Sequence, residues 1–580
     1  MLRLTIFAVT ILASTLTAHA AKVPVEAFPA ESTVVIRIAD IDKSVGKIKD
    51  LVAAVDPAQA EVAGASLGGF SGVLIDNPAR LGVKAGTDWW FAAIVEKGAP
   101  EPALVIAVES EDVAAVKDAV GEGYNYVEYE NWLLYSKDAD AMKKVEQCVS
   151  GSEANISKAI DEKAQKMGME ADLGVFLNIK QLVTDYKPEL EAAEANLDII
   201  LDAAAAEAQG AAAAAPGVDL EAIMDVYGDL GRAVLKSLND LDSCLFAMSV
   251  SEAGIHCEEY LAVTPGTPTA QYLAGSQTGA MKAFAQLPPN ELMYAGVNLD
   301  MSAMVKWSSE FMSAILGDEA EEKVDIDALV KDMKALEMGG YVSSFRLGSL
   351  QNGLFQVAAV YEVNDGAAAK EVYKNMLQAF SAIDTPFLKQ TMTYEDEVET
   401  IDGKPVDKVT LKQEFKAPME EEGELNPQQA QAKAMQQMAM QMMYGPEGAV
   451  SRIVYLKDRV LATTGGGSDA LAALMKSASS PQANPAFSAT RSKLDEQANL
   501  IVLFDLPSLI VKGVEIASAT GLIPPGALAL DGIEPSYLGY SLSASEAGLD
   551  AKAHIPTEQI RGIYQIAMQG FMMFQQLNGQ

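Results

Sequence analysis

The chain is poor in histidine, which limits the catalytic chemistry it can support. Three of its 580 residues are histidines, and His19 lies within the first twenty, so His256 and His554 are the two that remain further along. Serine and cysteine nucleophiles usually depend on a neighbouring imidazole base. Two candidate bases, each in a strand-like segment, do not identify a reaction. We therefore expect a protein that is not an enzyme.

Cysteine is equally scarce, with Cys148, Cys244 and Cys257 as the three present. An oxidising compartment would permit one disulfide among them and leave one thiol over. Cys244 and Cys257 lie in the two arms of one expected hairpin, but a turn at 252–254 puts them several residues out of register, too far apart for a bridge. Two alternatives stay open: Cys148 bridges one of the other two, or all three are thiols.

Long apolar runs are missing beyond the N-terminus. Residues 1–20 contain Arg3, an apolar run from Leu4 to Ala13 and the small-x-small pattern Ala18-His-Ala20, which together are typical of a signal peptide. No cysteine follows to accept a lipid, and later apolar runs are too short or too interrupted to span a bilayer. The sequence predicts a periplasmic or extracellular protein, cleaved near Ala20 and without stable membrane insertion. An uncleaved anchor is the alternative.

Positive charge is also low in proportion to negative charge. The chain has 43 Lys and Arg against 80 Asp and Glu, a formal net charge of −37. Such a surface repels phosphate backbones and anionic lipid headgroups, so we expect no nucleic-acid partner and no electrostatic membrane docking. The excess acid is typical of a solubilising surface, and a surface for a cation or basic partner is the alternative. The carboxylates are too numerous for any pair to stand out as catalytic.

A repeated heptapeptide is the clearest pattern that is present. Ser249-Val-Ser-Glu-Ala-Gly-Ile255 and Ser543-Ala-Ser-Glu-Ala-Gly-Leu549 each lie between two strand-like runs. Seven residues prove little alone, but the surrounding elements recur in one order, which predicts a duplicated chain. The matched segments are strands 29–38 and 289–299, each followed by a helix start at Asp40 or Asp300; strand pairs 90–95/103–108 and 341–347/354–360; helices 112–120 and 366–380; strands 132–136 and 459–463; segments 173–183 and 500–510; and hairpins 245–263 and 538–555.

Paired strands with interspersed helices predict an α+β fold class: two related domains, each an antiparallel sheet with helices packed on one face. We expect the signal peptide at 1–20, the first repeat domain at 21–268 and the second at 269–580, with a helix over 270–285 bridging them. Each half has an insertion that the other lacks, an Ala/Glu-rich helical stretch at 189–217 and a Met/Gln-rich helical stretch at 418–446.

The Met/Gln-rich insertion provides the candidate ligand or partner surface. Met435, Met438 and Met442 recur at helical spacing. Thioethers bind Cu(I), but methionine at this spacing is more typical of an adaptable apolar face, which packs in the core or binds an irregular apolar partner. We predict no cofactor and no metal site, and we keep these three residues as a possible ligand or partner surface.

Three other motifs have ordinary structural interpretations. Ile255-His-Cys-Glu-Glu259 resembles a ligand cluster, but strand alternation puts His256 and Glu258 on one face and Cys257 on the other, too few donors for zinc. Thr463-Thr-Gly-Gly-Gly-Ser-Asp469 lies between a strand and a helix, yet its spacing fits no phosphate-binding pattern. Trp89 and Trp90 must point to opposite faces of a strand, so we expect one in the core and the other at the surface or in an interface.

The opening strand Pro29-Ala-Glu-Ser-Thr-Val-Val, followed by Ala39-Asp-Ile-Asp, is repeated as Pro289-Asn-Glu-Leu. It resembles the opening of an exported bacterial family known only as a domain of unknown function. The resemblance would cover most of the mature chain. It implies a repeated α+β architecture outside the cytoplasm and provides no catalytic residues.

These observations favour a non-enzymatic binding or scaffolding protein outside the cytoplasm, with an unidentified protein or apolar small molecule as partner. A carrier that holds a lipid-like ligand between sheet and helices, under a Met-rich lid, is the alternative. A carboxylate-dependent hydrolase is the third hypothesis.

Overall fold

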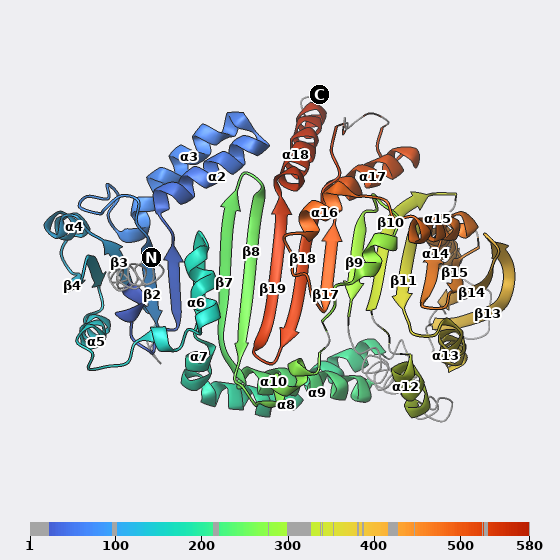
Figure 1. The fold of residues 1–580 in the computed structure, drawn as a ribbon, viewed down its shortest axis with the longest axis horizontal. Helices are drawn as coiled ribbons and strands as arrows, with labels where there is room; N and C mark the ends of the chain where they lie inside the picture. Colours follow the sequence, from blue (N-terminus) through green and yellow to red (C-terminus); the bar gives the residue numbers. More distant parts are fainter. Residues whose placement is uncertain are drawn as a thin grey trace, which may run out of the picture. The chain divides into compact units, whose positions relative to one another are not determined.

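The computed structural model describes residues 23–578 except 96–100, 213–219, 277, 299–325, 337, 339, 352, 380–381, 385–387, 416–426, 446, 525, 527–529 and 531. The expected signal peptide, the expected helix at Asp300 and the first part of the Met/Gln-rich insertion lie outside the described residues. The chain forms two compact units, described in turn, and Figure 1 labels their helices and strands. Unit 1 comprises residues 1–53, 57–186 and 242–251, and unit 2 comprises 54–56, 187–241 and 252–580.

Unit 1 is built on an antiparallel sheet. Neighbouring strands follow the order β4, β5, β3, β2, β1, β6, β7. The strands are β1 (Val34–Ile38), β2 (Trp89–Ile94), β3 (Ala103–Glu109), β4 (Asn125–Tyr129), β5 (Trp132–Ser136), β6 (Leu173–Leu177) and β7 (Leu241–Ser251). Its core joins Trp89, Phe91, Leu133 and Tyr135 of the sheet to Val116 of a helix.

The helices of unit 1 start where the sequence provides a cap. Asp112, Asp138, Asp161 and Asn178 each accept a hydrogen bond from a backbone N–H in the first turn, which satisfies a donor that the helix itself leaves unpaired. The helices are α2 (Ile41–Val55), α3 (Pro57–Ser71), α4 (Val113–Val120), α5 (Ala139–Val149), α6 (Glu162–Glu170) and α7 (Ile179–Asp185). The segment 173–183 is therefore a strand, a cap and a helix.

Unit 2 contains the larger antiparallel sheet. Its neighbouring strands follow the order β8, β19, β18, β17, β9, β10, β11, β16, β15, β14, β13, β12. They are β8 (Gly254–Val263), β9 (Met293–Val297), β10 (Gly340–Ser349), β11 (Gly353–Glu362), β12 (Ala382–Asp384), β13 (Leu388–Ile401), β14 (Lys404–Phe415), β15 (Ala449–Tyr455), β16 (Arg459–Thr464), β17 (Leu500–Phe504), β18 (Leu538–Ser545) and β19 (Gly548–Pro556). All strand pairings described in both units are antiparallel, so the α+β class is confirmed.

The helices of unit 2 include both predicted insertions. The Ala/Glu-rich stretch forms α8 (Lys187–Ala212), and the Met/Gln-rich stretch forms α14 (Pro427–Tyr444). The others are α9 (Leu220–Leu238), α10 (Pro268–Ala274), α12 (Ile326–Ala335), α13 (Gly366–Ala379), α15 (Gly467–Ser479), α16 (Pro485–Arg491), α17 (Leu506–Ala519) and α18 (Thr557–Asn578). No helix in the described residues of either unit is both long and apolar enough to cross a membrane.

The expected bridging helix at 270–285 is shorter than predicted. Helix α10 ends at Ala274, where Gly275 follows, and a 3-10 helix over Lys282–Gln286 comes only after Met281, whose φ is +47°. A residue with a left-handed backbone conformation cannot continue a right-handed helix. The second insertion is also larger than predicted, because β12, β13 and β14 have no counterpart among the strands of unit 1.

The strand order is similar in the two units. If β1 is matched with β9, the order β4, β5, β3, β2, β1, β6, β7 corresponds to β15, β16, β11, β10, β9, β17, β18. The register of β8 with β19 follows the same correspondence. Gly254, in the first heptapeptide, pairs with Pro556, and Gly548, in the second, pairs with Ala262.

Both faces of the β11–β16–β15 region are covered by helices, whereas the sequence predicted one covered face. Val454 and Leu461 pack with Leu471 and Leu474 of α15. Their neighbours Ile453 and Val460 point to the other face and pack with residues of α13, such as Leu377. Consecutive apolar residues in these strands require burial on both sides. The α13 face contains the candidate site.

Candidate functional site

An apolar cavity lies in unit 2 between the sheet and the helices α12 and α13. Its volume is about 210 Å³. Strands β11, β15 and β16 form its floor, α12 and α13 form its walls, and Leu336, Met338 and Val363 complete the lining. The lining residues are Met333, Leu336, Met338, Tyr361, Val363, Ala369, Val372, Tyr373, Met376, Ile453, Tyr455, Val460 and Ala462. None of them is charged.

Sequence periodicity explains how these residues converge. On β15, Ile453 and Tyr455 are two residues apart and therefore share a face, and they pair with Ala462 and Val460 of β16. On α13, the cavity residues Ala369, Val372, Tyr373 and Met376 have the i, i+3, i+4, i+7 spacing of one helical face. Methionines at positions 333, 338 and 376 fill irregular space adaptably, which suits a cavity that can change shape around a ligand.

Three tyrosines line the cavity, and none of its lining residues is charged. Burial raises the pKa of Tyr361, Tyr373 and Tyr455 above the usual value, so all three stay neutral at physiological pH. The Tyr455 hydroxyl is buried and has no hydrogen-bond partner. The neighbouring Tyr394 hydroxyl donates to Asp407, and it lies close enough to the Tyr455 hydroxyl to oppose part of the rise in the pKa of Tyr455. A buried hydroxyl left without a partner costs about 1–3 kcal/mol.

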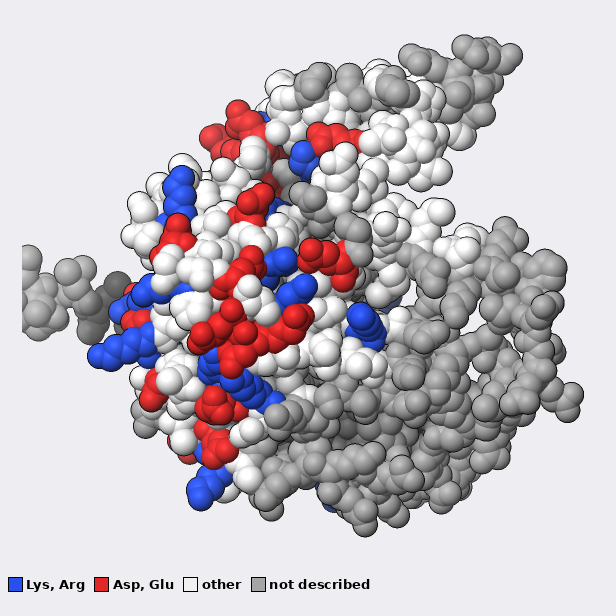
Figure 2. All heavy atoms as spheres, turned by 90° about the vertical axis from the view of Figure 1, so that its right-hand side faces the viewer, with Lys and Arg blue, Asp and Glu red and all other residues white. Residues whose placement is uncertain are grey.

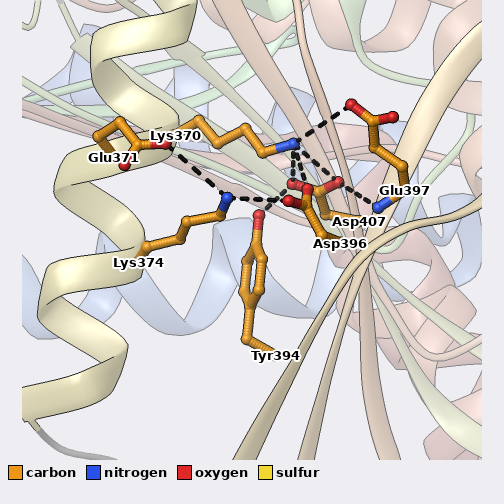
Figure 3. Close-up of polar contacts among 7 residues, drawn as sticks. All are labelled: Lys370, Glu371, Lys374, Tyr394, Asp396, Glu397 and Asp407. Atoms are coloured by element: carbon orange, nitrogen blue, oxygen red, sulfur yellow. Dashed lines mark hydrogen bonds and ion pairs between the residues drawn. The ribbon is translucent and has the colours of Figure 1, made fainter.

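A network of charged side chains lies beside the cavity and fixes α13 to β13 and β14 (Figure 3). Its centre is Asp407 of β14, which is 1% exposed. Its carboxylate accepts from Lys370 Nζ at 2.9 Å and from the backbone N–H of Glu397 at 2.9 Å, and also from the Tyr394 hydroxyl. These donors satisfy the buried carboxylate, which would otherwise be expensive to desolvate.

A β-bulge in β13 makes this arrangement possible. The register between β13 and β14 shifts between Glu395 and Glu399, where three residues of β13 stand opposite Asp407 alone. Glu397 at the bulge has a φ of +49°, and its N–H points to Asp407. Bulges redirect side chains and backbone groups in this way. Here the bulge also brings Asp396 to 2.5 Å from Lys370 Nζ.

The ammonium groups in the network are already neutralised. Burial alone would lower the pKa of Lys370, but its hydrogen bonds to Asp396 and Asp407 outweigh this effect and raise the pKa. Lys374 binds Asp396 at 3.1 Å, and the two lysines lower the pKa of Asp396 to about 2. Lys370 Nζ also lies 5.8 Å from the centre of the Tyr455 ring, a cation–π distance. On the side of the molecule where β13 and β14 lie, acidic and basic side chains are interspersed (Figure 2).

A second, polar cavity of about 390 Å³ lies at the glycine-rich turn predicted to join a strand to a helix. Gly465, Gly466 and Gly467 have φ values of +75°, +71° and +66°, so the turn needs glycine at all three positions. Arg452 also lines this cavity, but its guanidinium is bound by Glu399 at 2.8 Å and Glu447 at 3.2 Å. The interpretation as a structural turn therefore suffices.

The predicted methionine surface is apart from the apolar cavity. Met435 and Met438 of α14 are 64% and 66% exposed, and Met442 is half-buried. None of the three lines the cavity, whose methionines come from α12, α13 and the segment after α12. The exposure leaves a role as partner surface open as a prediction.

The two histidines lie together, as a cross-strand pair. His256 on β8 is directly opposite His554 on β19, with ring centroids 5.9 Å apart. His256 contacts Glu258 at 3.2 Å, the same-face pair that strand alternation predicts. Burial is the main reason why the pKa of His554 is lowered. Among the described residues, no three His, Cys, Asp or Glu side chains are grouped so that they could hold a metal ion.

The structure also settles the positions of the tryptophans and cysteines. Trp89 and Trp90 are 1% and 6% exposed, so neither ring lies at the surface of unit 1. Both faces of β2 are covered, which is why alternation did not bring either ring to solvent. No disulfide joins any of Cys148, Cys244 and Cys257 in the described structure.

Sequence reasoning missed both the cavity and the network. The spacing of Lys370 and Lys374 at i, i+4 on a predicted helix was a visible signal of a shared face. Nothing in the sequence distinguished Asp407 from the other carboxylates, because its burial depends on a bulge. Comparison with protein-family models, curated proteins and solved structures gives no match. The resemblance to an exported family of unknown function therefore stays a prediction.

Proposed function

We propose that the protein binds a small apolar molecule in the cavity between α12, α13 and the sheet of unit 2. The observation that carries this proposal is the cavity itself, about 210 Å³ lined by aliphatic, methionine and tyrosine side chains without a charge. An engineered apolar cavity of about 150 Å³ stays free of water and binds benzene. A space somewhat larger, with a lining of the same kind, suits a ligand of roughly eight to ten non-hydrogen atoms.

The proposal selects among the three functional hypotheses from the sequence. It favours the carrier over a protein that only presents surfaces, because a concave, largely apolar space with an uncharged lining is typical of a ligand-binding site. It omits the Met-rich lid, since Met435 and Met438 do not line the cavity. It also omits hydrolysis, because Asp407 is committed to Lys370 and Tyr394.

We further infer that the protein is exported and that its chain arose by duplication. Export is supported by the N-terminal Arg3, the apolar run and the Ala18-His-Ala20 site. Duplication is supported by the shared strand order and by the register of β8 with β19. Backbone contacts around that register agree: Val263 N donates to Ala547 O, and Thr557 N, at the matching position, donates to Ala253 O. An export assay with and without residues 1–20 tests the first inference.

A cavity-filling variant tests the binding function. Ala369 is 6% exposed and lines the cavity, whereas Ala368, its neighbour on α13, is exposed. Replacing Ala369 by leucine adds three carbons to the lining of the cavity. Protein purified from its native envelope is extracted and analysed by mass spectrometry for a stoichiometric apolar molecule. We expect the molecule with the unmodified protein and with Ala368→Leu, and its loss from Ala369→Leu.

The stability of the same variants completes the test. Filling an empty apolar space commonly stabilises a protein by about 0.5–2 kcal/mol, so Ala369→Leu should have an equal or higher melting temperature. A folded Ala369→Leu protein that still carries the molecule would place the ligand elsewhere. An unmodified protein that carries no apolar molecule, and binds neither ethylbenzene nor acetophenone in a calorimetric titration, would refute the proposed function.

A further inference from the structure

The two histidines beyond residue 20 meet at one point of unit 2, although they come from opposite halves of the chain. His256 of β8 and His554 of β19 are direct cross-strand partners, and their ring centroids are 5.9 Å apart. The two strands lie side by side and pair over residues 254–262 and 548–556 (Figure 1). Imidazole is the side chain whose charge ordinarily changes between about pH 5 and 8, so both groups of this kind are placed where they can affect each other.

His554 is buried on a face of the sheet that α16 and the segment after it cover. Its residue is 7% exposed. Its partner on β18 is Gly539, where an added Cβ would lie 2.5 Å from Thr490 of α16 and 3.0 Å from Leu494. Because directly paired residues share a face of the sheet, these two side chains cover the side on which the imidazole lies. A charged imidazole would therefore lose much of its hydration there.

The charged groups that face His256 already form a chain of contacts. Glu258, on the same face of β8, lies 3.2 Å from His256 Nε2, so a proton on that nitrogen has an acceptor. Lys552 of β19 lies 3.7 Å from Glu258 and also binds Asp495 at 2.9 Å. Glu258 is therefore shared between an imidazole and an ammonium group, and it does not face His554 alone.

The surroundings of His554 oppose its protonation. Burial is the main reason why its pKa is lowered, and the positive charges of His256, when protonated, and of Lys493 lower it further. A hydrogen bond to the backbone of Ile255 and the carboxylate of Glu558 on α18 act in the opposite direction, to a smaller extent. Protonation of both rings would thus place two like charges across one strand pair, at a site where water screens them poorly.

We propose that His256 and His554 form an acid-sensitive switch, which opens the pairing of β8 with β19 when both rings are protonated. The pKa of His554 in the folded protein lies below its usual value of 6.5, so its contribution to stability is present above about pH 6.5 and is lost as the pH falls. The first turn of α18 should open with the strands, because Thr557 donates to the backbone oxygens of Glu252 and Ala253 next to β8. Neither histidine lines the apolar cavity, so this inference is independent of the proposed function.

Hydrogen exchange of the full chain, measured by mass spectrometry at about pH 5 and about pH 7.5, tests the switch. Rates are normalised at each pH to those of an unfolded chain. We expect the protection of β8, β19 and the first turn of α18 to fall about ten-fold at the lower pH, since one pKa unit is a factor of ten in an equilibrium constant. Peptides of β15 and β16 are the reference. An equal loss in the reference, or no loss in β8 and β19, would overturn the proposal.

Three variants assign the effect to the imidazoles. His554→Gln should abolish the loss of protection at low pH, because glutamine does not gain a proton. His256→Gln, at a half-buried position, should reduce the loss by removing the repelling charge, and it serves if His554→Gln does not fold. Glu259→Gln, exposed on the other face of β8, is the control and should respond to acid like the unmodified protein. A full acid response in either histidine variant, or its disappearance in the control, would refute the role of the pair.

Nuclear magnetic resonance of protein with carbon-13-labelled histidine rings follows the protonation itself. His256→Gln and His554→Gln identify the signals of the two rings. We expect the folded-state signal of His554 to titrate below about pH 6.5 and to be replaced by the signal of an opened strand in the same pH range. A His554 ring that becomes protonated while it keeps the chemical environment of the folded strand would show that the pairing tolerates both charges, and the switch would be excluded.

Discussion

Replacing Asp407 by asparagine should loosen α13 far more than the same change at Asp396, although both carboxylates bind Lys370. The two differ in burial: the side chain of Asp407 is 2% exposed and that of Asp396 is 53% exposed. An asparagine at 407 would keep the shape but remove the charge that neutralises Lys370, and its amide would confront the N–H of Glu397. Removing one partner of a buried pair typically costs about 3–5 kcal/mol.

The expected loss of stability lies below that range. Lys370 would still have Asp396 at 2.5 Å, and its own side chain is 18% exposed, so part of its charge stays compensated. We estimate a loss of about 2–3 kcal/mol for Asp407→Asn, which corresponds to a roughly 30- to 150-fold loss of amide protection. The Asp396→Asn change should have a much smaller effect, because water and salt screen a half-exposed pair.

Hydrogen exchange measured by mass spectrometry is the suitable assay, because it reports local opening without requiring that the two units unfold together. Peptides covering α13 and β14 should lose protection in Asp407→Asn, while peptides covering α5 in unit 1 provide an internal reference. The effect of Asp407→Asn should persist at high salt. Equal loss of protection in the two variants, or none in Asp407→Asn, would refute the view that the buried carboxylate fixes the helix.

Two further predictions concern other parts of unit 2. Glu291 is 5% exposed, and burial raises its pKa to about 7, so the folded protein binds a proton more readily than the unfolded chain between about pH 4.5 and 7. The contribution of Glu291 to the free energy of unfolding therefore falls as pH rises through that window. The free energy of unfolding of Glu291→Gln, relative to that of the unmodified protein, should accordingly increase by about 2–3 kcal/mol from pH 5 to pH 8. A difference in thermal stability that does not vary with pH would contradict this. Gly254→Ala and Gly548→Ala should each destabilise by more than about 2 kcal/mol, because φ is +131° and +149° and an added Cβ would lie 2.1 and 2.0 Å from a carbonyl oxygen of the paired strand. Gly570→Ala, which meets nothing within 4 Å, is the control, and equal melting temperatures for all three variants would be the contrary result.

The sequence predicted the core strands of unit 2 well because their signals are local. Alternation and caps identified β9, β11 and β16 to within a few residues, and the repeated Ser-Glu-Ala-Gly turns placed the hairpins that contain β8 and β19. The glycines in those turns now have a physical reason, since each allows a close backbone approach between β8 and β19. Strand alternation and turn residues can be recognised in the sequence without knowing which residues pack against them.

The candidate site could not be predicted because its determinants are non-local. Asp407 is followed by lysine in an unremarkable polar strand, and only the bulge in β13 and the approach of α13 bury it. The cavity likewise depends on how three strands and two helices leave space between them. Methionine spacing drew attention to α14, while the methionines at the cavity, Met333, Met338 and Met376, are too widely separated to form a motif.

Helix α13 connects the network to the cavity, since its two adjacent rows of side chains have different tasks. Lys370 and Lys374 bind the carboxylates of β13 and β14, while Ala369 and Val372 line the cavity from the neighbouring row. The ion pairs therefore fix the distance between this helix and the sheet, and that distance sets the width of the cavity. A buried network holds such a spacing more firmly than apolar contacts, which tolerate sliding, because each displaced donor or acceptor would be left unsatisfied. On this reasoning the network, though it need not touch the ligand, preserves the space that the ligand occupies.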